Sequence, residues 1–357
     1  MSAYPHEALR LQNAFRLVRR QIADGRARYT GLAVGRADGL VRAELHGPDG
    51  VLAGPRRFLI ASITKPITAT AILQLVEEGR LGLSDPIQRY IPEFRPESSA
   101  PGQPGAEAVT AWHLLTHTSG IADAGTELVE TERPTPAALL DLACTRPLRF
   151  VPGGRYEYAS DSFYLLAELV RRVGGSDLAG HLRGRIFTPL GMSATSFDPE
   201  DPGPPALPLG GYFDRFGLEL PAATRYFVSL RLPGGGLWST VTDLARFGRA
   251  MLNDGALDGG RVLGKPFVEQ MTREQTAGIL EAGDPPRDPH YALGWSRPGL
   301  VAGSPASPEA FGHSGATGSY LMVDPRRNLV IVVLHNEWDA PMAPTDELIE
   351  AVYSALD

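Results

Sequence analysis

The pattern of apolar and polar positions divides the chain into three parts. Apolar residues recur at helical spacing over residues 11–22, with arginines between them, which predicts an amphipathic surface helix near the N-terminus. Two strand-like runs follow within residues 29–47, and Asp38-Gly39 between them is a strong β-hairpin signal. The first part of the chain is therefore expected to form a helix followed by a strand pair.

Helical signals dominate the middle of the chain, residues 62–204. The run TATAILQLVEEG ends on Gly79, and FYLLAELVRRVGG ends on a glycine pair, as helices commonly do. Beyond it the pattern returns to short strands and turns, including the apolar run LVIVVL, which predicts a buried strand. We therefore expect an α/β (α+β) fold. Both chain ends, 1–61 and 205–357, would form a lobe that contains the sheet, around an inserted helical lobe.

Composition and charge exclude several classes of protein. The 357 residues are 43% apolar and 21% charged, with glycine and proline spread over many turns, which is typical of a globular chain. The formal charge is −7, and no basic run is longer than a pair, so a nucleic-acid or anionic-membrane surface is disfavoured. No metal-binding or cofactor-binding motif is found, so neither a metal nor a cofactor is expected.

The chain is also predicted to be soluble and cytoplasmic. It begins without a secretory signal pattern, and its longest apolar run is too short to span a bilayer. The single Cys144 cannot form an internal disulfide, which suits a reducing compartment, and we interpret it as a small core residue. The strong arginine bias suggests a bacterial genome rich in G and C.

Two basic residues depart from that bias. Of the 34 basic residues only Lys65 and Lys265 are lysines, and a lysine, unlike an arginine, can lose its proton when desolvated. Lys65 follows Ser62 by three residues, which on a helix puts both side chains on one face. A serine hydroxyl needs a neighbour that accepts its proton to become a good nucleophile. The pair fits a nucleophile and its base, although the spacing alone also fits a helix-capping serine beside a solvated lysine.

Two later stretches favour the catalytic interpretation. VPGGRYEYASDSFYLLAELV places Tyr158 in a turn before an amphipathic helix, where a phenol near a lysine could act as a general base. FGHSGATGSYLMVDP places His313 beside a strand, where it could donate to a substrate or to the tyrosine oxygen, and Gly315 would let backbone approach a ligand. Singly, Tyr158 and His313 are typical packing and turn residues, but together and in this order they indicate a site.

These motifs resemble the serine β-lactamase and penicillin-binding protein superfamily. The nearest branch contains class C β-lactamases, family VIII esterases and D-amino-acid peptidases. The resemblance covers roughly residues 28–340 and rests on SITK, PGGRYEYAS and HSG, with LLTHTSGI, GGLWSTVTDLARF and YALGW in support. It implies an antiparallel sheet flanked by helices, an all-helical lobe over 62–204, and an active site between the two lobes.

The resemblance also implies roles for individual residues. Ser62 would be the acylated nucleophile, while Lys65 and Tyr158 would deprotonate it and later activate water. Which of the two is the base stays open. The backbone N–H groups of Ser62 and Ala316 would form the oxyanion hole.

The resemblance implies four substrate-binding residues, one of which departs from the family pattern. They are Ser160, His313, Ser314 and Gly315. Ser160 stands where the family commonly has asparagine, and its shorter hydroxyl can bond Lys65 but reaches less far toward a penicillin side chain. His313 stands where class C enzymes have a lysine, so a strong carboxylate anchor is missing. Many esterases and peptidases of this branch have His-x-Gly at the position of HSG, so both Ser160 and His313 favour ester hydrolysis over β-lactam hydrolysis.

The sequence therefore predicts a carboxylesterase that forms an acyl-enzyme on Ser62. The same residues also fit a D-amino-acid amidase or peptidase, an acyltransferase, or a weak β-lactamase. A catalytically silent binding protein of the same fold is the non-enzyme alternative. The expected partner is a small ester or amide, with no nucleic acid and no membrane, and the oligomeric state does not follow from the sequence.

Several weaker signals are set aside. His113 and His117 are four residues apart, as zinc ligands can be, but HLLTH lacks the glutamate of H-E-x-x-H, so structural roles are expected. The run GGRVLGK, residues 259–265, superficially resembles a phosphate loop but continues with proline and is interpreted as a turn. No G-x-S-x-G elbow occurs, which argues against an α/β-hydrolase. Glu157 and Asp161 are assigned no role.

Overall fold

The computed structural model describes residues 4–123, 126–211 and 220–356. It contains a six-stranded sheet with the order β3-β2-β1-β10-β9-β8, and all neighbouring strands are antiparallel. Half of the strands come from each end of the chain: β1 (Thr30–Arg36), β2 (Gly39–Gly47), β3 (Gly50–Val51), β8 (Phe311–Ser314), β9 (Tyr320–Asp324) and β10 (Leu329–His335). The predicted fold class, with one sheet built from both chain ends, is confirmed.

The two faces of the sheet bury different helices because successive side chains of a strand point to opposite faces. Ile331 and Val333 of β10 pack into one apolar cluster with α2 (Gln12–Ala23) and α13 (Ala343–Leu356). Val330 and Val332 pack into the other cluster with α11 (Val241–Leu252). Every residue of β10 is therefore buried, as its continuous apolar run predicted.

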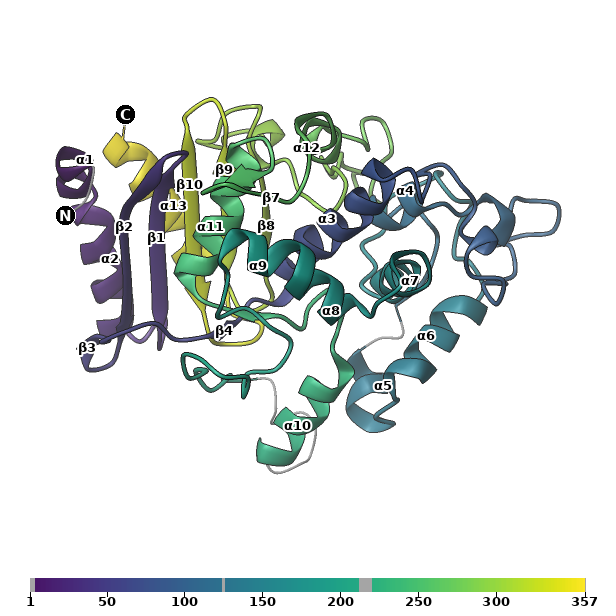
Figure 1. Cartoon of the computed structure of the whole chain (residues 1–357), viewed down its shortest axis with the longest axis horizontal. Helices are drawn as coiled ribbons and strands as arrows, with labels where there is room; N and C mark the ends of the chain where they lie inside the picture. The colour runs from purple at the N-terminus through teal and green to yellow at the C-terminus, as the bar shows by residue number, and fades with distance from the viewer. Residues whose placement is uncertain (1–3, 124–125, 212–219, 357) are drawn as a thin grey trace.

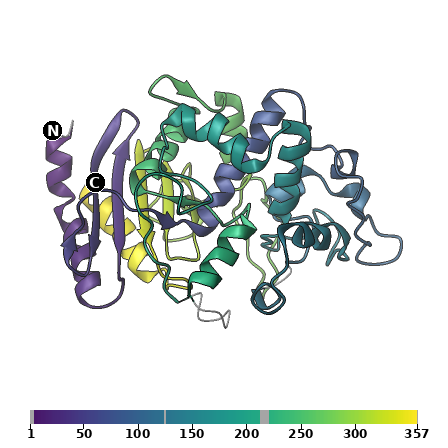
Figure 2. The same ribbon diagram turned by 60° about the horizontal axis from the view of Figure 1, so that its bottom comes forward.

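The first and last helices lie together on the outer face of the sheet. Helix α1 (Pro5–Arg10) leads into α2, which packs beside α13, and both chain ends lie at this side of the molecule (Figures 1 and 2). The side-chain amide of Gln21 donates to Pro344 O at 2.9 Å, and Arg26 pairs with Glu347 at 2.7 Å. The helix predicted over 11–22 thus corresponds to α2.

The remaining helices lie mostly on the other side of the sheet, towards the right in Figure 1. The α-helices are α3 (Thr64–Glu77), α4 (Ala111–Leu115), α5 (Thr126–Thr131), α6 (Pro136–Thr145), α7 (Ser162–Leu169), α8 (Leu178–Leu182), α9 (Thr188–Leu190), α10 (Leu220–Leu230) and α12 (Lys265–Thr272). Short 3-10 segments are η1 (Ala61–Ile63), η2 (Ile87–Arg89), η3 (Ala106–Ala108) and η7 (Pro298–Leu300), and π-helical turns are η4 (Val170–Gly174) and η5 (Arg183–Phe187).

Two small strand pairs complete the described structure. They are β4 (Phe58–Leu59) with β5 (Trp238–Ser239), and β6 (Ala256–Leu257) with β7 (Gly260–Arg261). The first pair ties the segment before α3 to the segment before α11, so it connects the helical region to the sheet. Among the described residues, no helix is long and apolar enough to cross a membrane.

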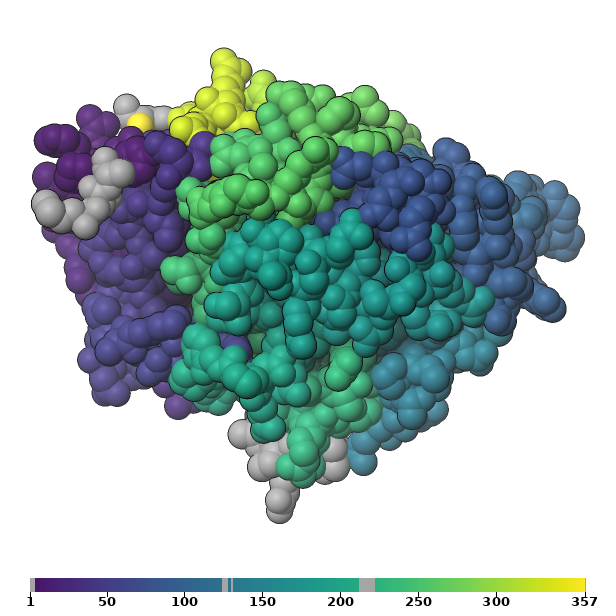
Figure 3. Space-filling view, viewed as in Figure 1, coloured from purple at the N-terminus to yellow at the C-terminus, as the bar shows by residue number. Residues whose placement is uncertain are grey.

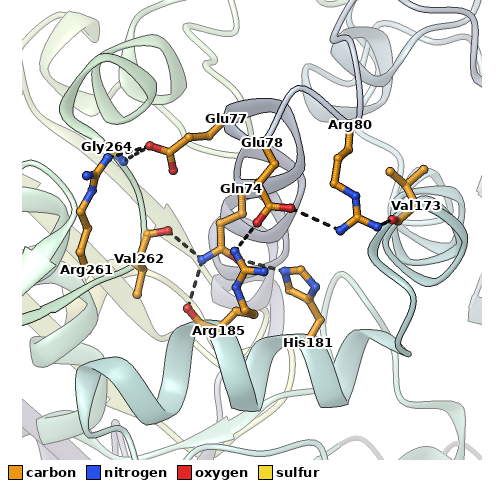
Figure 4. A network of polar contacts seen from close by, with 10 residues as sticks. All are labelled: Gln74, Glu77, Glu78, Arg80, Val173, His181, Arg185, Arg261, Val262 and Gly264. Atoms are coloured by element: carbon orange, nitrogen blue, oxygen red, sulfur yellow. Dashed lines mark hydrogen bonds and ion pairs between the residues drawn. The ribbon is translucent and has the colours of Figure 1, made fainter.

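Helix α3 is buried along most of its length and is held near its C-terminal end. Near its C-terminal end Gln74 donates to Arg185 O at 3.1 Å and to Val262 O at 2.7 Å, and its oxygen lies 2.9 Å from His181 Nε2 (Figure 4). Glu78 on the same helix pairs with Arg185. Because these partners come from α8, η5 and the segment before α12, the helix has a fixed position from which its N-terminal end presents side chains.

The division into lobes at residues 204 and 205 stays a prediction. Leu230 of α10 lies after that boundary, yet it packs with Leu139 of α6 and Tyr164 of α7. In the space-filling view the surface runs without a break from the N-terminal segments at one end to the segments around residues 80–150 at the other (Figure 3).

Candidate active site

Ser62 lies in the 3-10 turn η1, directly before α3. The preceding Ala61 has φ +45°, in the left-handed region that residues with a Cβ rarely adopt. The turn is nevertheless fixed, since Ile60 N donates to Leu237 O at 2.9 Å and strands β4 and β5 pair beside it. Such strained and over-determined backbone is a common feature of functional sites.

Lys65 is fully buried one turn further along and contacts three oxygens. Its Nζ lies 3.0 Å from Ser62 Oγ, 3.2 Å from Ser160 Oγ and 2.9 Å from Gly234 O. Burial lowers the pKa of Lys65 to about 7, although the charges of Asp123 and Asp161 oppose this fall. Roughly half of the amine is therefore neutral at pH 7.

The contacts of Lys65 determine how a neutral amine would be oriented. A neutral amine has two N–H donors and one lone pair. The carbonyl of Gly234 can only accept, and the hydroxyl of Ser160 can accept the second N–H. The lone pair is then left for Ser62, whose hydroxyl lies 3.0 Å away and can donate to it. This geometry fits proton transfer from serine to lysine.

Tyr158 is the third predicted catalytic residue, and it lies beside the other two. Its ring centroid is 4.7 Å from Lys65 Nζ, and its hydroxyl is hydrogen-bonded to Ser62. The residue is 38% exposed, but burial of the hydroxyl raises the pKa of Tyr158, and the bond to Ser62 only partly opposes this rise. The phenol is therefore protonated at neutral pH.

A cavity of about 290 Å³ opens beside these groups. Ser62, Tyr158, Ser160 and Ala316 all line it, so the structure brings most of the predicted site residues together. The other described lining residues are mainly apolar, with two carboxylates: Ala61, Asp123, Val129, Leu139, Asp161, Tyr164, Leu232, Pro233, Gly234, Gly235 and Trp338. Among the lining residues that the structure describes there is no Lys, Arg or His.

The backbone of the third motif, HSG, lies close to the turn that carries Ser62. A Cβ on Gly315 would lie 2.6 Å from Ile60 O, closer than real Cβ atoms come, so only glycine permits this approach. It brings Ala316 to the cavity wall that also holds Ser62. Ser314 is exposed at the end of β8.

His313 of the same motif is turned into the protein. It is buried, its Nε2 lies 2.9 Å from Tyr291 Oη, and its Nδ1 lies 2.7 Å from Ser314 O. Burial and the nearby charge of Lys65 together lower the pKa of His313 to about 3. The ring is thus neutral, and both of its nitrogens have partners within the protein.

Sequence reasoning missed several residues of the site. The carbonyl of Gly234 bonds Lys65, and a Cβ at Gly234 would lie 3.2 Å from both Lys65 Nζ and Phe163. The run of three glycines in PGGGLWST was a usable signal for this close approach. His117, which was expected to be structural, and Tyr291 both lie against the site, but no local pattern connects them to Tyr158. Asp123 carried no signal either.

Of the residues that were set aside, Asp161 lines the cavity and His117 lies against the ring of Tyr158, whereas the others named below lie elsewhere in the fold. His113 caps α4 by contacting Thr110. Lys265 is exposed and pairs with Asp254 at 3.1 Å. Cys144 is buried, as expected of a core residue.

Known proteins of this kind share both the sequence and the fold. Residues 18–354 match the Beta-lactamase family. Esterase EstB of Burkholderia gladioli is 30% identical over 372 residues, which span 92% of this chain and 89% of EstB. The fold is similar to the crystal structure of a family VIII carboxylesterase, with a TM-score of 0.76, 20% identity and 99% of each chain covered.

A penicillin-binding protein homologue from Caulobacter crescentus has a similar fold, with a TM-score of 0.75, 23% identity and 99% of each chain covered. The resemblance seen in the sequence motifs is thereby confirmed. The match over nearly the whole chain and the identity to EstB place the protein: it belongs to the beta-lactamase family, within the serine hydrolase superfamily.

Proposed function

We propose that the protein is a carboxylesterase that forms an acyl-enzyme on Ser62 and hydrolyses small esters. The observation that carries the proposal is the 3.0 Å contact between Ser62 Oγ and the buried Nζ of Lys65, whose pKa is lowered to about 7. A lysine that is half neutral at pH 7 has a lone pair available to accept the serine proton as the oxygen attacks. An amine with an ordinary pKa would be almost fully protonated.

The proposed acylation step moves one proton from Ser62 to the leaving alcohol by way of Lys65 and Tyr158. Neutral Lys65 takes the proton from Ser62 as its oxygen attacks the ester carbonyl carbon. The N–H groups of Ser62 and Ala316 stabilise the resulting oxyanion. When the C–O bond to the alcohol breaks, the protonated Tyr158 donates its proton to the leaving oxygen and regains one from Lys65. This assigns Lys65 as the base of acylation, because the raised pKa of Tyr158 keeps the phenol protonated.

Deacylation would run through the same groups in reverse. A water molecule in the place of the departed alcohol gives a proton to the Lys65 and Tyr158 pair and attacks the acyl carbon. The bond to Ser62 Oγ then breaks, and the serine regains its proton. The free acid leaves, and the site returns to its initial protonation state.

The cavity supports an ester over a β-lactam or a peptide with a free carboxylate. Its described walls carry the carboxylates of Asp123 and Asp161 and no cationic side chain, so an acidic substrate would be repelled. Ser160 lies 3.2 Å from Lys65, and its short side chain leaves little reach towards an acylamino group. Ser160, Ser314 and the backbone at Gly315 would contact the substrate.

A second candidate has one observation in its favour. Asp123 and Asp161 in the cavity could pair with a free amino group, as carried by the substrates of a D-amino-acid amidase. An acyltransferase would use the same acyl-enzyme with an alcohol or amine in place of water. The predicted cytoplasmic location and the two-lobe division remain proposals.

One experiment separates these functions. Hydrolysis of p-nitrophenyl esters, nitrocefin and D-amino-acid anilides would be compared at equal enzyme concentration, with mass spectrometry of the fluorophosphonate adduct. We expect ester turnover well above the other two and an adduct on Ser62. Nitrocefin turnover at the rate of the esters would refute the ester preference. A folded protein without an adduct on Ser62 would favour the silent binding protein.

A further inference from the structure

His117 holds the short segment that carries Tyr158 through three separate contacts. Its carbonyl oxygen accepts from Glu157 N at 2.9 Å, and its Nδ1 accepts from Ala159 N at 3.1 Å. Its ring lies 4.3 Å from the ring of Tyr158, centroid to centroid, with 32° between the planes. The residues on both sides of Tyr158 and the tyrosine ring itself are thus all fixed by one side chain and its backbone.

The hydrogen bonds of His117 determine its tautomer. Because Nδ1 accepts from a backbone N–H, the proton of the neutral ring lies on Nε2. Nε2 is 3.3 Å from Tyr291 Oη, so it donates to that oxygen. Burial lowers the pKa of His117 well below its usual value, and the charge of Lys65 lowers it further, which keeps the ring neutral.

The chain of hydrogen bonds continues from Tyr291 to strand β8. His313 Nδ1 faces the carbonyl of Ser314 at 2.7 Å and must donate to it, so His313 Nε2 is an acceptor. The hydroxyl of Tyr291, 2.9 Å from that nitrogen, donates to it. Protons are therefore ordered in one direction, from His117 through Tyr291 and His313 to Ser314.

The backbone of His117 gives an independent indication that its position is imposed. Its φ is +58°, a left-handed conformation that is uncommon for a residue with a Cβ. His117, Tyr291 and His313 are each at most 4% exposed. A strained conformation of this kind persists only where surrounding contacts over-determine it.

We propose that His117 is a positioning residue that fixes Tyr158 beside Ser62 and Lys65, and that Tyr291 and His313 brace His117. The inference rests on the proposed acyl transfer at Ser62. It gives the histidine of the HSG motif a role that does not require contact with substrate. It also connects the stretches LLTHTSGI, YALGW and HSG to the tyrosine of the second motif.

The test uses Tyr291→Phe, which removes one hydroxyl and leaves the ring, together with His117→Ala and His117→Asn. Asparagine keeps an oxygen that can accept from Ala159 N and tolerates a positive φ, so it should restore part of what alanine loses. His113→Asn is the matched control, since His113 lies four residues earlier and contacts Thr110 instead.

The readouts are kcat and KM on a p-nitrophenyl ester and the rate of fluorophosphonate labelling of Ser62. We expect kcat to fall about tenfold in Tyr291→Phe and about a hundredfold in His117→Ala, because small displacements of a reacting group cost factors of this size. KM should change little, His117→Asn should recover activity relative to His117→Ala, and His113→Asn should match the wild type.

If His117→Ala fails to fold, Tyr291→Phe and His117→Asn decide the matter alone. Wild-type kcat and labelling rate in a folded Tyr291→Phe variant would overturn the bracing role. A His117→Asn variant no better than His117→Ala, or a His113→Asn variant as impaired as either, would overturn the positioning role. All three outcomes leave the proposed function intact if the wild type labels on Ser62, whereas an unlabelled wild type would overturn both the positioning role and the proposed function.

Discussion

The lowered pKa of Lys65 predicts an unusual dependence of stability on pH. A lysine in the unfolded chain has a pKa of 10.5, whereas that of Lys65 in the folded protein is about 7. Between these values the unfolded state binds more protons than the folded state, so the free energy of unfolding rises with pH across this window. Below pH 7 both states are protonated, and folding bears the full cost of burying the charge. At about 1.4 kcal/mol per pH unit, that cost is about 5 kcal/mol.

The most accessible part of this effect lies between pH 7 and 9. Folded Lys65 is half neutral at pH 7 and almost fully neutral at pH 9, so the free energy of unfolding should rise by about 2 kcal/mol from this residue alone. Urea denaturation of the wild type and of Lys65→Met at pH 7, 8 and 9 isolates the contribution of Lys65 to the pH dependence of the free energy of unfolding. Methionine is always neutral, and whatever it loses in contacts with Gly234 O is the same at each pH.

The chain supplies its own control, because its only other lysine is exposed. The hydrogen bond that Lys265 donates to Asp254 raises the pKa of Lys265, so Lys265 keeps its proton in both states from pH 7 to 9. Lys265→Met should therefore retain the wild-type slope. Parallel pH dependence in the wild type and Lys65→Met would refute the reasoning. The same pKa should appear as a rise in kcat/KM through about pH 7, since the proposed acylation step requires the neutral amine.

Two substitutions test the other parts of the site. Lys65→Arg keeps a cation that cannot give up its proton, so ester turnover and labelling of Ser62 should fall by about a thousandfold or more while circular dichroism still shows a folded protein; near-normal turnover would remove Lys65 from the mechanism. Gly315→Ala places a Cβ 2.6 Å from Ile60 O and should displace Ala316 from the turn of Ser62. We expect kcat to fall about a hundredfold with an unchanged KM, measured on p-nitrophenyl esters, and an unchanged kcat would argue against Ala316 N–H as an oxyanion donor.

The sequence predicted what local patterns encode. The period of apolar residues predicted α2 and the buried strand β10, and Asp38-Gly39 lies where β1 turns into β2. Both ends of the chain also form one sheet, as expected. The register of β1 on β10, which aligns Thr30 with His335, could not be predicted, since it depends on packing between segments that are about 300 residues apart.

For the site, too, the sequence predicted the contacts between neighbouring residues but not those between distant segments. Helical spacing was enough to expect Ser62 beside Lys65, because one turn of helix connects them. Whether that lysine is a base or a solvated cation depends on its pKa, and that is set by burial against segments far away in the sequence. Gly234 supplies the carbonyl, Ser160 supplies the hydroxyl, and the packing of Tyr158 and Phe163 around Nζ excludes water.

For this reason a serine three residues before a lysine is weak evidence of a catalytic pair, whereas the assembled site is strong evidence. The contact at 3.0 Å between Lys65 and Ser62 is local and would exist on many helices. A lysine is neutral at pH 7 only where the effect of burial outweighs that of nearby negative charges. Asp123 and Asp161 raise the pKa of Lys65 and so oppose the effect of its burial. In the proposed mechanism, the balance between burial and these two carboxylates sets the fraction of enzyme that carries a neutral Lys65. A cationic substrate group paired with Asp123 would shift that balance further towards the neutral amine, so ligand charge and acylation rate should be coupled at this site.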